Sequence, residues 1–307
     1  MTRPFTRRDL LRATGTAGTL GLAGCIASGN TPTVSVLAAG SLAVLFEDRV
    51  GPAFEAETSM SYRGEFHGSK ALIQLVKSGR RNPDVMVSAD ASLLRRALSE
   101  RVPWDVVFAS NAVGITYNRK TEMGRRLASR TPWYRAILES DGKIARTDPD
   151  LDPLGYRTVQ LFKLAERYYG IDGLARSLLE KSVIDPSEVH LLASVETGVR
   201  PAAVAYRNMA VDRNLPFETL PDRLSFAEPS LAEYYATATY TTANGTTIEG
   251  SPVKYNATIP TVADDPSAGR RFVSFLLEHP GLLEAGGLIV PGSFPRPHGP
   301  VPEEVMP

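Results

Sequence analysis

The chain has 307 residues, with 34 basic and 34 acidic side chains and a formal net charge of zero. This length allows one large or two ordinary domains with a buried core, and it excludes a small protein that depends on disulfides or metals for stability. The neutral charge balance gives no general attraction to nucleic acid, so we expect no nucleic-acid partner. The single cysteine excludes a disulfide framework or a thiolate metal cluster within the chain.

The first residues have the order of an export signal. Arg7 and Arg8 precede a short apolar stretch and resemble a twin-arginine signal, and the segment that ends at Cys25 resembles a lipobox. We therefore expect residues 1–24 to be a signal peptide and residues 25–33 to be a lipidated cysteine followed by a tether. A buried helix or a membrane span is disfavoured, because the stretch is rich in Gly and Thr and shorter than about 20 apolar residues. The mature protein is then anchored to the outer face of the cell membrane.

Short strands alternate with helices in the first part of the mature chain. Periodicity predicts two strands at 34–39 and 84–88, and helices at 42–56, 70–77 and 91–99. This alternation predicts an α/β fold with a parallel sheet.

The rest of the chain predicts a second α/β body. The expected helices are 133–138, 160–169, a helix-like segment at 194–198 that follows Val189–Leu192, and 267–277. The expected strands are 106–109 and 112–117 as an extended pair, then 202–206, 217–220, 234–241 and 257–259. The proline-rich end is expected to be irregular.

Signatures of catalysis are missing from the sequence. The four histidines (His67, His190, His279, His298) have no metal-ligand spacing, and there is no nucleophile elbow, phosphate loop or dinucleotide fingerprint. We therefore expect no enzyme, no cofactor and no resident metal.

Two Gly-Ser pairs stand where a loop leads into a predicted helix. Gly40-Ser41 and Gly68-Ser69 would each present free backbone N–H groups, the positive end of a helix dipole and a hydroxyl donor. Two such helix starts facing one cleft would hold a tetrahedral oxyanion. The alternative is that both serines are ordinary helix N-caps.

Three acids alternate in a loop before the helix at 160–169. Asp148, Asp150 and Asp152 suggest a calcium loop, but the glycine and the distal glutamate of an EF-hand are missing and prolines restrict the loop. An Asp-Pro turn at a helix entrance is the simpler interpretation.

Several segments together carry a family resemblance. They are Leu37-Ala38-Ala39-Gly40-Ser41-Leu42, Phe66-His67-Gly68-Ser69, Val87-Ser88-Ala89-Asp90, Asp150 to Thr158 with Leu164 to Tyr169, Tyr206-Arg207-Asn208-Met209-Ala210, and Pro229 to Tyr235. In this order the chain resembles the archaeal molybdate/tungstate-binding lipoproteins of ABC importers. The resemblance implies a two-lobed periplasmic-binding-protein fold of the second type, each lobe a sheet flanked by helices, with the ligand between the lobes. Lobe I would then be 34–110 with 224–295, lobe II 111–223, and the tail 296–307.

The resemblance also implies a set of oxyanion-binding residues: Gly40, Ser41 and Ser69 from lobe I, and Asp152, Pro153 and Leu154 from lobe II. In the family an Asp and a Glu add carboxylate oxygens to the metal centre of the oxyanion. The Glu is expected directly before Tyr206-Arg207-Asn208, where this chain has Ala205. We therefore predict that the second carboxylate is lost and that coordination stays closer to tetrahedral. Glu196 and Glu218 remain open as replacements.

The predicted function is a solute receptor. It would act as a monomer, close two lobes on molybdate or tungstate and deliver the ligand to an ABC transporter permease, without catalysing a reaction. The alternatives are a receptor for sulfate, phosphate or a carboxylate ligand, or an exported hydrolase that binds a divalent metal through Asp148, Asp150 and Asp152.

Overall fold

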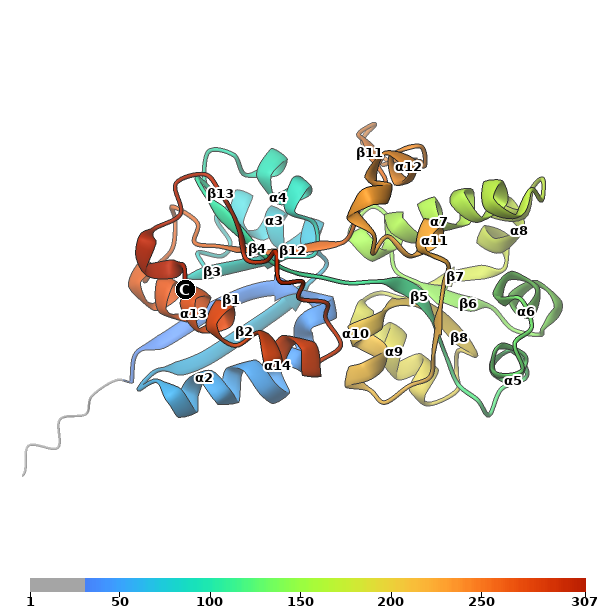
Figure 1. The fold of residues 1–307 in the computed structure, drawn as a ribbon, viewed down its shortest axis with the longest axis horizontal. Coiled ribbons are helices and arrows are strands. Elements are labelled where there is room, and N and C mark those ends of the chain that lie inside the picture. The colour runs from blue at the N-terminus through green and yellow to red at the C-terminus, as the bar shows by residue number, and fades with distance from the viewer. Residues whose placement is uncertain (1–30) are drawn as a thin grey trace, which may run out of the picture. The chain divides into compact units, whose positions relative to one another are not determined.

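Two β-sheets organise residues 31–307, the part of the chain that the computed structural model describes (Figure 1). The predicted signal peptide and Cys25 lie outside the described residues. We use lobe I for the part that contains the six-stranded sheet and lobe II for the part that contains the five-stranded sheet. The expectation of an α/β fold with two sheets flanked by helices is confirmed.

The sheet of lobe I has the strand order β13-β4-β12-β3-β1-β2. Its strands are β1 (Thr33–Ala39), β2 (Ser61–His67), β3 (Val85–Ser88), β4 (Asp105–Ser110), β12 (Lys254–Thr258) and β13 (Arg296–His298). β1 runs parallel to both β2 and β3, whereas β12 and β13 pair antiparallel to their neighbours. Parallel pairing of β1, β2 and β3 brings their carboxyl ends to one edge of the sheet.

The sheet of lobe II has the order β7-β6-β8-β5-β9. Its strands are β5 (Val113–Tyr117), β6 (Ile144–Arg146), β7 (Ser182–Ile184), β8 (Ala202–Tyr206) and β9 (Phe217–Thr219). A separate hairpin, β10 (Thr239–Thr241) with β11 (Thr247–Glu249), lies in the segment that returns the chain to lobe I.

Helices cover the sheets. Those near the lobe I sheet are η2 (Gly40–Leu42), α1 (Ala43–Leu45), η3 (Phe46–Val50), α2 (Gly51–Glu57), α3 (Ser69–Lys77), α4 (Ala91–Ala97), α13 (Pro266–Glu278), α14 (Pro280–Ala285) and η5 (Glu303–Val305). Those that follow β5 are α5 (Glu122–Ala128), α6 (Trp133–Glu139), α7 (Pro153–Tyr169), α8 (Leu174–Glu180), α9 (Glu188–Glu196), α10 (Arg207–Asp212), α11 (Asp222–Ser225), η4 (Pro229–Leu231) and α12 (Ala232–Ala236).

Side chains that alternate along the strands of lobe I form two separate hydrophobic layers, one on each face of the sheet. Leu37 of β1 and Met86 of β3 pack with the apolar faces of α3 and α4. The neighbouring strand residues point to the opposite face, because successive side chains of a strand alternate. On that face, Phe54 of α2 packs edge-to-face against Phe272 of α13 with ring centroids 5.2 Å apart. Figure 1 shows these two helix layers on opposite sides of the sheet.

Several expectations about the elements are wrong. The helix expected at 160–169 begins at Pro153 as α7, and the helix-like segment expected at 194–198 is the end of α9, which begins at Glu188. Strands 106–109 and 112–117 do not pair with each other, because β4 joins the lobe I sheet and β5 joins the lobe II sheet. The segment 234–241 is the helix α12 followed by the short strand β10. The tail is not wholly irregular, since β13 adds a strand beside β4 and η5 buries Val305.

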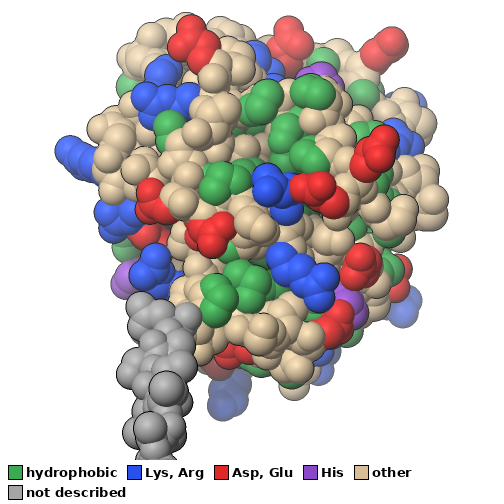
Figure 2. All heavy atoms as spheres, turned by 90° about the vertical axis from the view of Figure 1, so that its left-hand side faces the viewer, with side chains coloured by type: hydrophobic (Ala, Val, Ile, Leu, Met, Phe, Trp, Pro, Cys, Tyr) green, Lys and Arg blue, Asp and Glu red, His purple; other side chains and the backbone are tan. Residues whose placement is uncertain are grey.

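The surface of the protein agrees with its neutral charge. On the face drawn in Figure 2, Lys and Arg side chains are interspersed with Asp and Glu, and small hydrophobic patches lie between them. This face presents no continuous basic surface. Within residues 31–307, no helix has the length and hydrophobicity that crossing a bilayer requires.

Candidate functional site

The two Gly-Ser turns of lobe I lie at the same edge of its sheet. β1 ends at Ala39, directly before Gly40, and β2 ends at His67, directly before Gly68. Ala39 and His67 are paired in the parallel ladder. The sheet therefore holds the two helix starts side by side, as the sequence predicted for an anion-binding edge.

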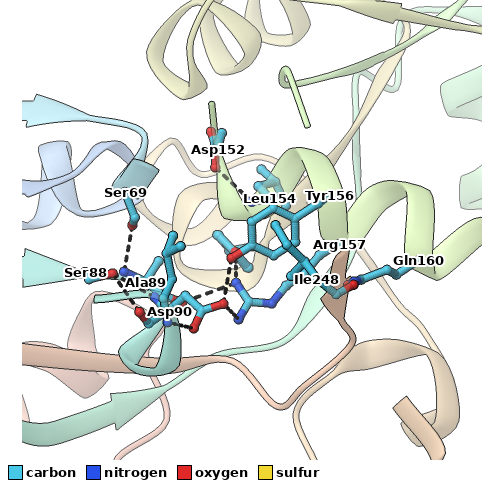
Figure 3. Close-up of polar contacts among 12 residues, drawn as sticks. Ser69, Ser88, Ala89, Asp90, Asp152, Leu154, Tyr156, Arg157, Gln160 and Ile248 are labelled. Carbon is cyan, nitrogen blue, oxygen red and sulfur yellow. Dashed lines mark hydrogen bonds and ion pairs between the residues drawn. The ribbon is translucent and has the colours of Figure 1, made fainter. Parts of the chain in front are cut away.

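Neither serine is a helix N-cap. The N-cap of η2 is Ala39 and that of α3 is Gly68, and neither position makes a side-chain capping bond. Both serines are buried, and their hydroxyls are held by other groups: Ser41 Oγ lies 2.9 Å from the Tyr255 hydroxyl, and Ser69 Oγ accepts the Ala89 N–H at 2.9 Å (Figure 3). A hydroxyl bonded in this way keeps capacity for a further partner.

Lobe II brings Asp152 against the second turn. Asp152 is the N-cap of α7, where its Oδ1 accepts the Leu154 N–H at 2.8 Å, and only 6% of the residue is exposed. A Cβ at Gly68 would lie 2.7 Å from the Leu151 carbonyl oxygen and 3.2 Å from Asp152 Cβ. Only glycine permits this approach, so the turn at Gly68 contacts the loop that carries Asp152.

Lobe II brings a second carboxylate against the first turn. Glu188 is the first residue of α9 and only 4% exposed. A Cβ at Gly40 would clash with Glu188 Oε2. Each Gly-Ser turn of lobe I therefore faces one buried carboxylate of lobe II, and the sequence reasoning missed Glu188.

Burial controls the charge of both acids. Burial raises the pKa of Asp152 to about 6, against the lowering effect of the Leu154 N–H and the Arg157 guanidinium. Burial also raises the pKa of Glu188 well above its ordinary range, and the neighbouring charge of Asp152 raises it further. The Ser41 N–H and Arg157 act in the opposite direction. Two acids in this setting hold protons more readily than free side chains.

A buried hydroxyl lies beside Asp152. Thr147 is 1% exposed, and its Oγ1 makes no hydrogen bond of ordinary geometry within residues 31–307. This hydroxyl points to the Asp152 carboxylate closely enough to lower the pKa of that acid. Thr147 is therefore a buried donor beside Asp152 that the sequence reasoning did not identify.

The remaining predicted site residues are placed as follows. Pro153 and Leu154 form the first turn of α7 and are buried beside Asp152. Ala205 lies inside β8, where it pairs with Gly114 of β5 and is fully buried. The buried carboxylate that faces Gly40 is Glu188 of α9, and this strand supplies none.

The two proposed replacements do not face the turns as Glu188 does. Glu196 ends α9 with its side chain half exposed, 3.6 Å from Arg213. Glu218 lies on β9, at the edge of the lobe II sheet, and burial raises its pKa.

The three aspartates before α7 do not converge on one point. Asp148 Oδ1 accepts the Asp150 N–H at 2.8 Å, and Asp150 Oδ1 accepts the Ala243 N–H at 2.9 Å. In the described part of the chain, the three-residue group of potential ligands close enough to share a metal ion is Glu57, Glu278 and His279, away from this loop. Within residues 31–307, this arrangement does not support a metal site built from Asp148, Asp150 and Asp152.

Comparison with known proteins identifies the family. Residues 34–282 match the family described as bacterial extracellular solute-binding protein. The chain belongs to this family. It shares 46% identity over 306 residues with an uncharacterized solute-binding protein of Halobacterium salinarum, covering 98% of each chain.

Two further relatives carry names that state a ligand. A putative ABC transporter molybdenum-binding protein of Haloferax volcanii is 39% identical over 302 residues, covering 97% of this chain and 96% of the relative. A molybdate/tungstate-binding protein of Thermococcus kodakarensis is 28% identical over 298 residues, covering 84% of each.

Solved structures agree on the fold of this solute-binding protein. The periplasmic molybdate-binding protein of Azotobacter vinelandii superposes with a TM-score of 0.61 at 15% identity, covering 84% of this chain and 99% of that one. The sulfate-binding protein of Mycobacterium tuberculosis gives a TM-score of 0.59 at 12% identity, covering 85% and 88%. At these identities the likeness establishes the two-lobed fold alone.

Proposed function

We propose that this solute-binding protein captures molybdate or tungstate for an ABC importer. The observation that carries the proposal is the pairing of each lobe I Gly-Ser turn with a buried carboxylate of lobe II, Gly40 with Glu188 and Gly68 with Asp152. The names of the Haloferax and Thermococcus relatives support the same ligands.

The chemistry of the two lobes is complementary. Backbone N–H groups and the hydroxyls of Ser41, Ser69 and Thr147 offset the cost of removing a dianion from water. Two carboxylates beside a dianion would repel it unless their oxygens bond directly to its central atom. Molybdenum and tungsten can accept additional oxygen ligands, whereas sulfur and phosphorus keep four. The pair Asp152 and Glu188 therefore favours molybdate and tungstate over sulfate and phosphate.

This proposal changes the expected coordination. Because Ala205 stands where the family has its glutamate, the sequence predicts an oxyanion coordination closer to tetrahedral. With Glu188 beside Gly40, both lobe II acids can approach the metal centre, and we propose six near oxygen neighbours. X-ray absorption on the tungstate complex measures this number directly. Four near neighbours would refute the role of the acids as ligands.

Calorimetric titration tests the ligand. The unliganded protein is titrated separately with tungstate, molybdate, sulfate and phosphate at one ionic strength. We expect saturable binding of the first two at a stoichiometry of one and much weaker binding of the others. Equal affinity for sulfate would contradict the proposal, and phosphate ester hydrolysis would support an enzyme instead.

We also propose that the mature protein is a monomeric lipoprotein that delivers its ligand to a membrane permease. Cys25 is the sole cysteine and ends the lipobox-like segment. Cys25→Ser should move the exported protein from the membrane fraction to the soluble fraction without changing oxyanion affinity. Unchanged membrane association would refute the lipid anchor.

A further inference from the structure

A second cluster of buried polar side chains joins the lobes beside the proposed oxyanion site. Tyr156 and Arg157 of α7 in lobe II reach Asp90, which follows β3 in lobe I (Figure 3). The Tyr156 hydroxyl donates to Asp90 Oδ2 at 2.6 Å, and Arg157 Nη2 lies 3.5 Å from the same oxygen. Arg157 Nη1 donates to the Ala89 carbonyl at 3.2 Å. We call Asp90, Tyr156 and Arg157 the latch.

The latch is fully desolvated and held in place within each lobe. Asp90 is 4% exposed, and Tyr156 and Arg157 are each 1% exposed. Asp90 Oδ1 is fixed as the N-cap of α4 by the Leu93 N–H at 2.9 Å. In lobe II, Arg157 Nη1 also donates to the Tyr206 hydroxyl at 2.8 Å. A charge pair buried in this way is costly to leave with one partner missing.

Two structural connections link the latch to the oxyanion-binding groups, one through hydrogen bonds of Ala89 and one through helix α7. On the lobe I side, Ala89 donates its N–H to Ser69 Oγ and accepts Arg157 through its carbonyl. On the lobe II side, Asp152 caps the same helix that carries Tyr156 one turn later. Residues four apart lie on one face of a helix, so movement of α7 that brings Asp152 to Gly68 also brings Tyr156 to Asp90.

Charge gives the latch a second connection to the site. The Arg157 guanidinium lowers the pKa of both Asp152 and Glu188, although neither acid forms an ion pair with it. Asp90 holds this guanidinium at the lobe boundary. Asp90 is thus a positioning residue, whereas Asp152 and Glu188 are the proposed ligands.

We propose that the latch sets the balance between open and closed lobes and thereby the affinity for oxyanion. This inference rests on the proposed function for its ligand, but the closing motion is measurable without one. An intact latch favours the closed form, in which the donors of lobe I and the acids of lobe II meet. When the latch is broken, closure of the lobes buries Arg157 without the full set of contacts at Asp90 that balances its charge.

Two conservative variants test the latch. Tyr156→Phe removes one cross-lobe hydrogen bond and keeps the ring. Asp90→Asn removes the charge that pairs with Arg157, while asparagine still caps α4. Matched controls remove buried side-chain hydrogen bonds that do not involve the latch. They are Asp105→Asn, whose carboxylate is held by Arg95 and Asn256 within lobe I, and Tyr235→Phe, whose hydroxyl donates to the Asp222 carbonyl.

Lobe separation is measured by spin labels on the full chain. In a Cys25→Ser background, cysteines replace the exposed Lys77 of α3 and Arg176 of α8, and pulsed dipolar spectroscopy gives the distance distribution with and without tungstate. We expect both latch variants to shift the distribution toward longer distances and to weaken tungstate binding about 10- to 100-fold. Circular dichroism checks the fold, and if Asp90→Asn does not fold, Tyr156→Phe decides the test.

The outcomes separate the latch from the ligand. The proposal is overturned if neither variant changes the distances, if the controls change them equally, or if the wild type never populates the short distance. If the wild type binds no oxyanion in calorimetry while the distances still depend on Asp90 and Tyr156, the proposed function fails and the latch stands.

Discussion

The two lobes bring opposite chemistry to the site. Lobe I presents N–H groups and hydroxyls at two helix starts, a surface that would accept any tetrahedral oxyanion. Lobe II presents two buried acids, Asp152 and Glu188, which would repel an anion that could not bond to them. Under the proposed function, we therefore expect lobe I to supply general anion affinity and lobe II to supply selectivity.

Removing the acids should have the largest effect. We expect Glu188→Gln and Asp152→Asn each to weaken tungstate binding by about 100-fold or more, because a desolvated charged contact is lost. Sulfate binding should stay equal or improve, since one repulsive charge is gone. Calorimetry with both anions measures the ratio, and Glu196→Gln at the far end of α9 is the control. An equal loss of affinity for tungstate and for sulfate would show that the two acids only support the fold.

The same acids should lower the stability of the unliganded protein at neutral pH. Asp152 has a folded pKa of about 6 against an ordinary 3.8, so between about pH 4 and pH 6 the folded protein holds a proton that the unfolded chain releases. Stability therefore falls as pH rises through this window, by up to about 3 kcal/mol in total. Asp152→Asn should flatten this slope and raise the melting temperature above pH 6. Thermal unfolding at pH 4 to 8 measures the pH dependence of stability, and an unchanged slope in Asp152→Asn would contradict its assignment to Asp152.

The lobe I hydroxyls should matter for every oxyanion. Ser41→Ala or Ser69→Ala should cost about 1.5–3 kcal/mol of binding free energy, because a hydrogen bond to a charged ligand is lost. In contrast to the acid variants, tungstate and sulfate should weaken in parallel. Ser129→Ala on the exposed end of α5 is the matched control. Wild-type affinity in either variant would assign that serine a structural role only.

Close approach of the lobes can be tested at one glycine. Gly68→Ala places a methyl group 2.7 Å from the Leu151 carbonyl oxygen, a backbone atom with little freedom to move. We expect the added methyl group to destabilise the closed form by about 1–3 kcal/mol, and therefore to weaken the binding of all oxyanions. Gly281→Ala, where the added carbon meets no atom within 4 Å, is the control. Unchanged affinity would mean that the two loops do not meet when the ligand binds.

The sequence predicted both Gly-Ser turns of lobe I as helix starts, but only one of the two strands that lead into them. The strand before Gly40 is apolar and was predicted, whereas β2 before Gly68 is polar and partly exposed and was not. The sequence was not sufficient for Glu188, because its pattern predicts a helix-like segment only from Ser194, after this acid. Ser187 as N-cap, with Leu191, Leu192 and Val195 on one face, was the available signal for the helix that places this acid.

Long-range pairing explains the other errors. Ser110 and Val113 are three residues apart yet belong to different sheets, and no local propensity reports where a chain changes sheet. The tail strand β13 is only three residues long and gains its structure from β4, which is far away in sequence. Local patterns could not predict either feature.

The strand order of lobe I has a consequence for synthesis on the ribosome. β12 lies between β3 and β4, so these two strands have no common partner until residues 254–258 have been made. All strands of lobe II lie between residues 113 and 219, and its sheet can be completed earlier. The first strands of lobe I emerge first, but lobe I is expected to finish folding last. Until β12 has been made, one edge of β4 is unpaired and open to wrong pairing with other strands.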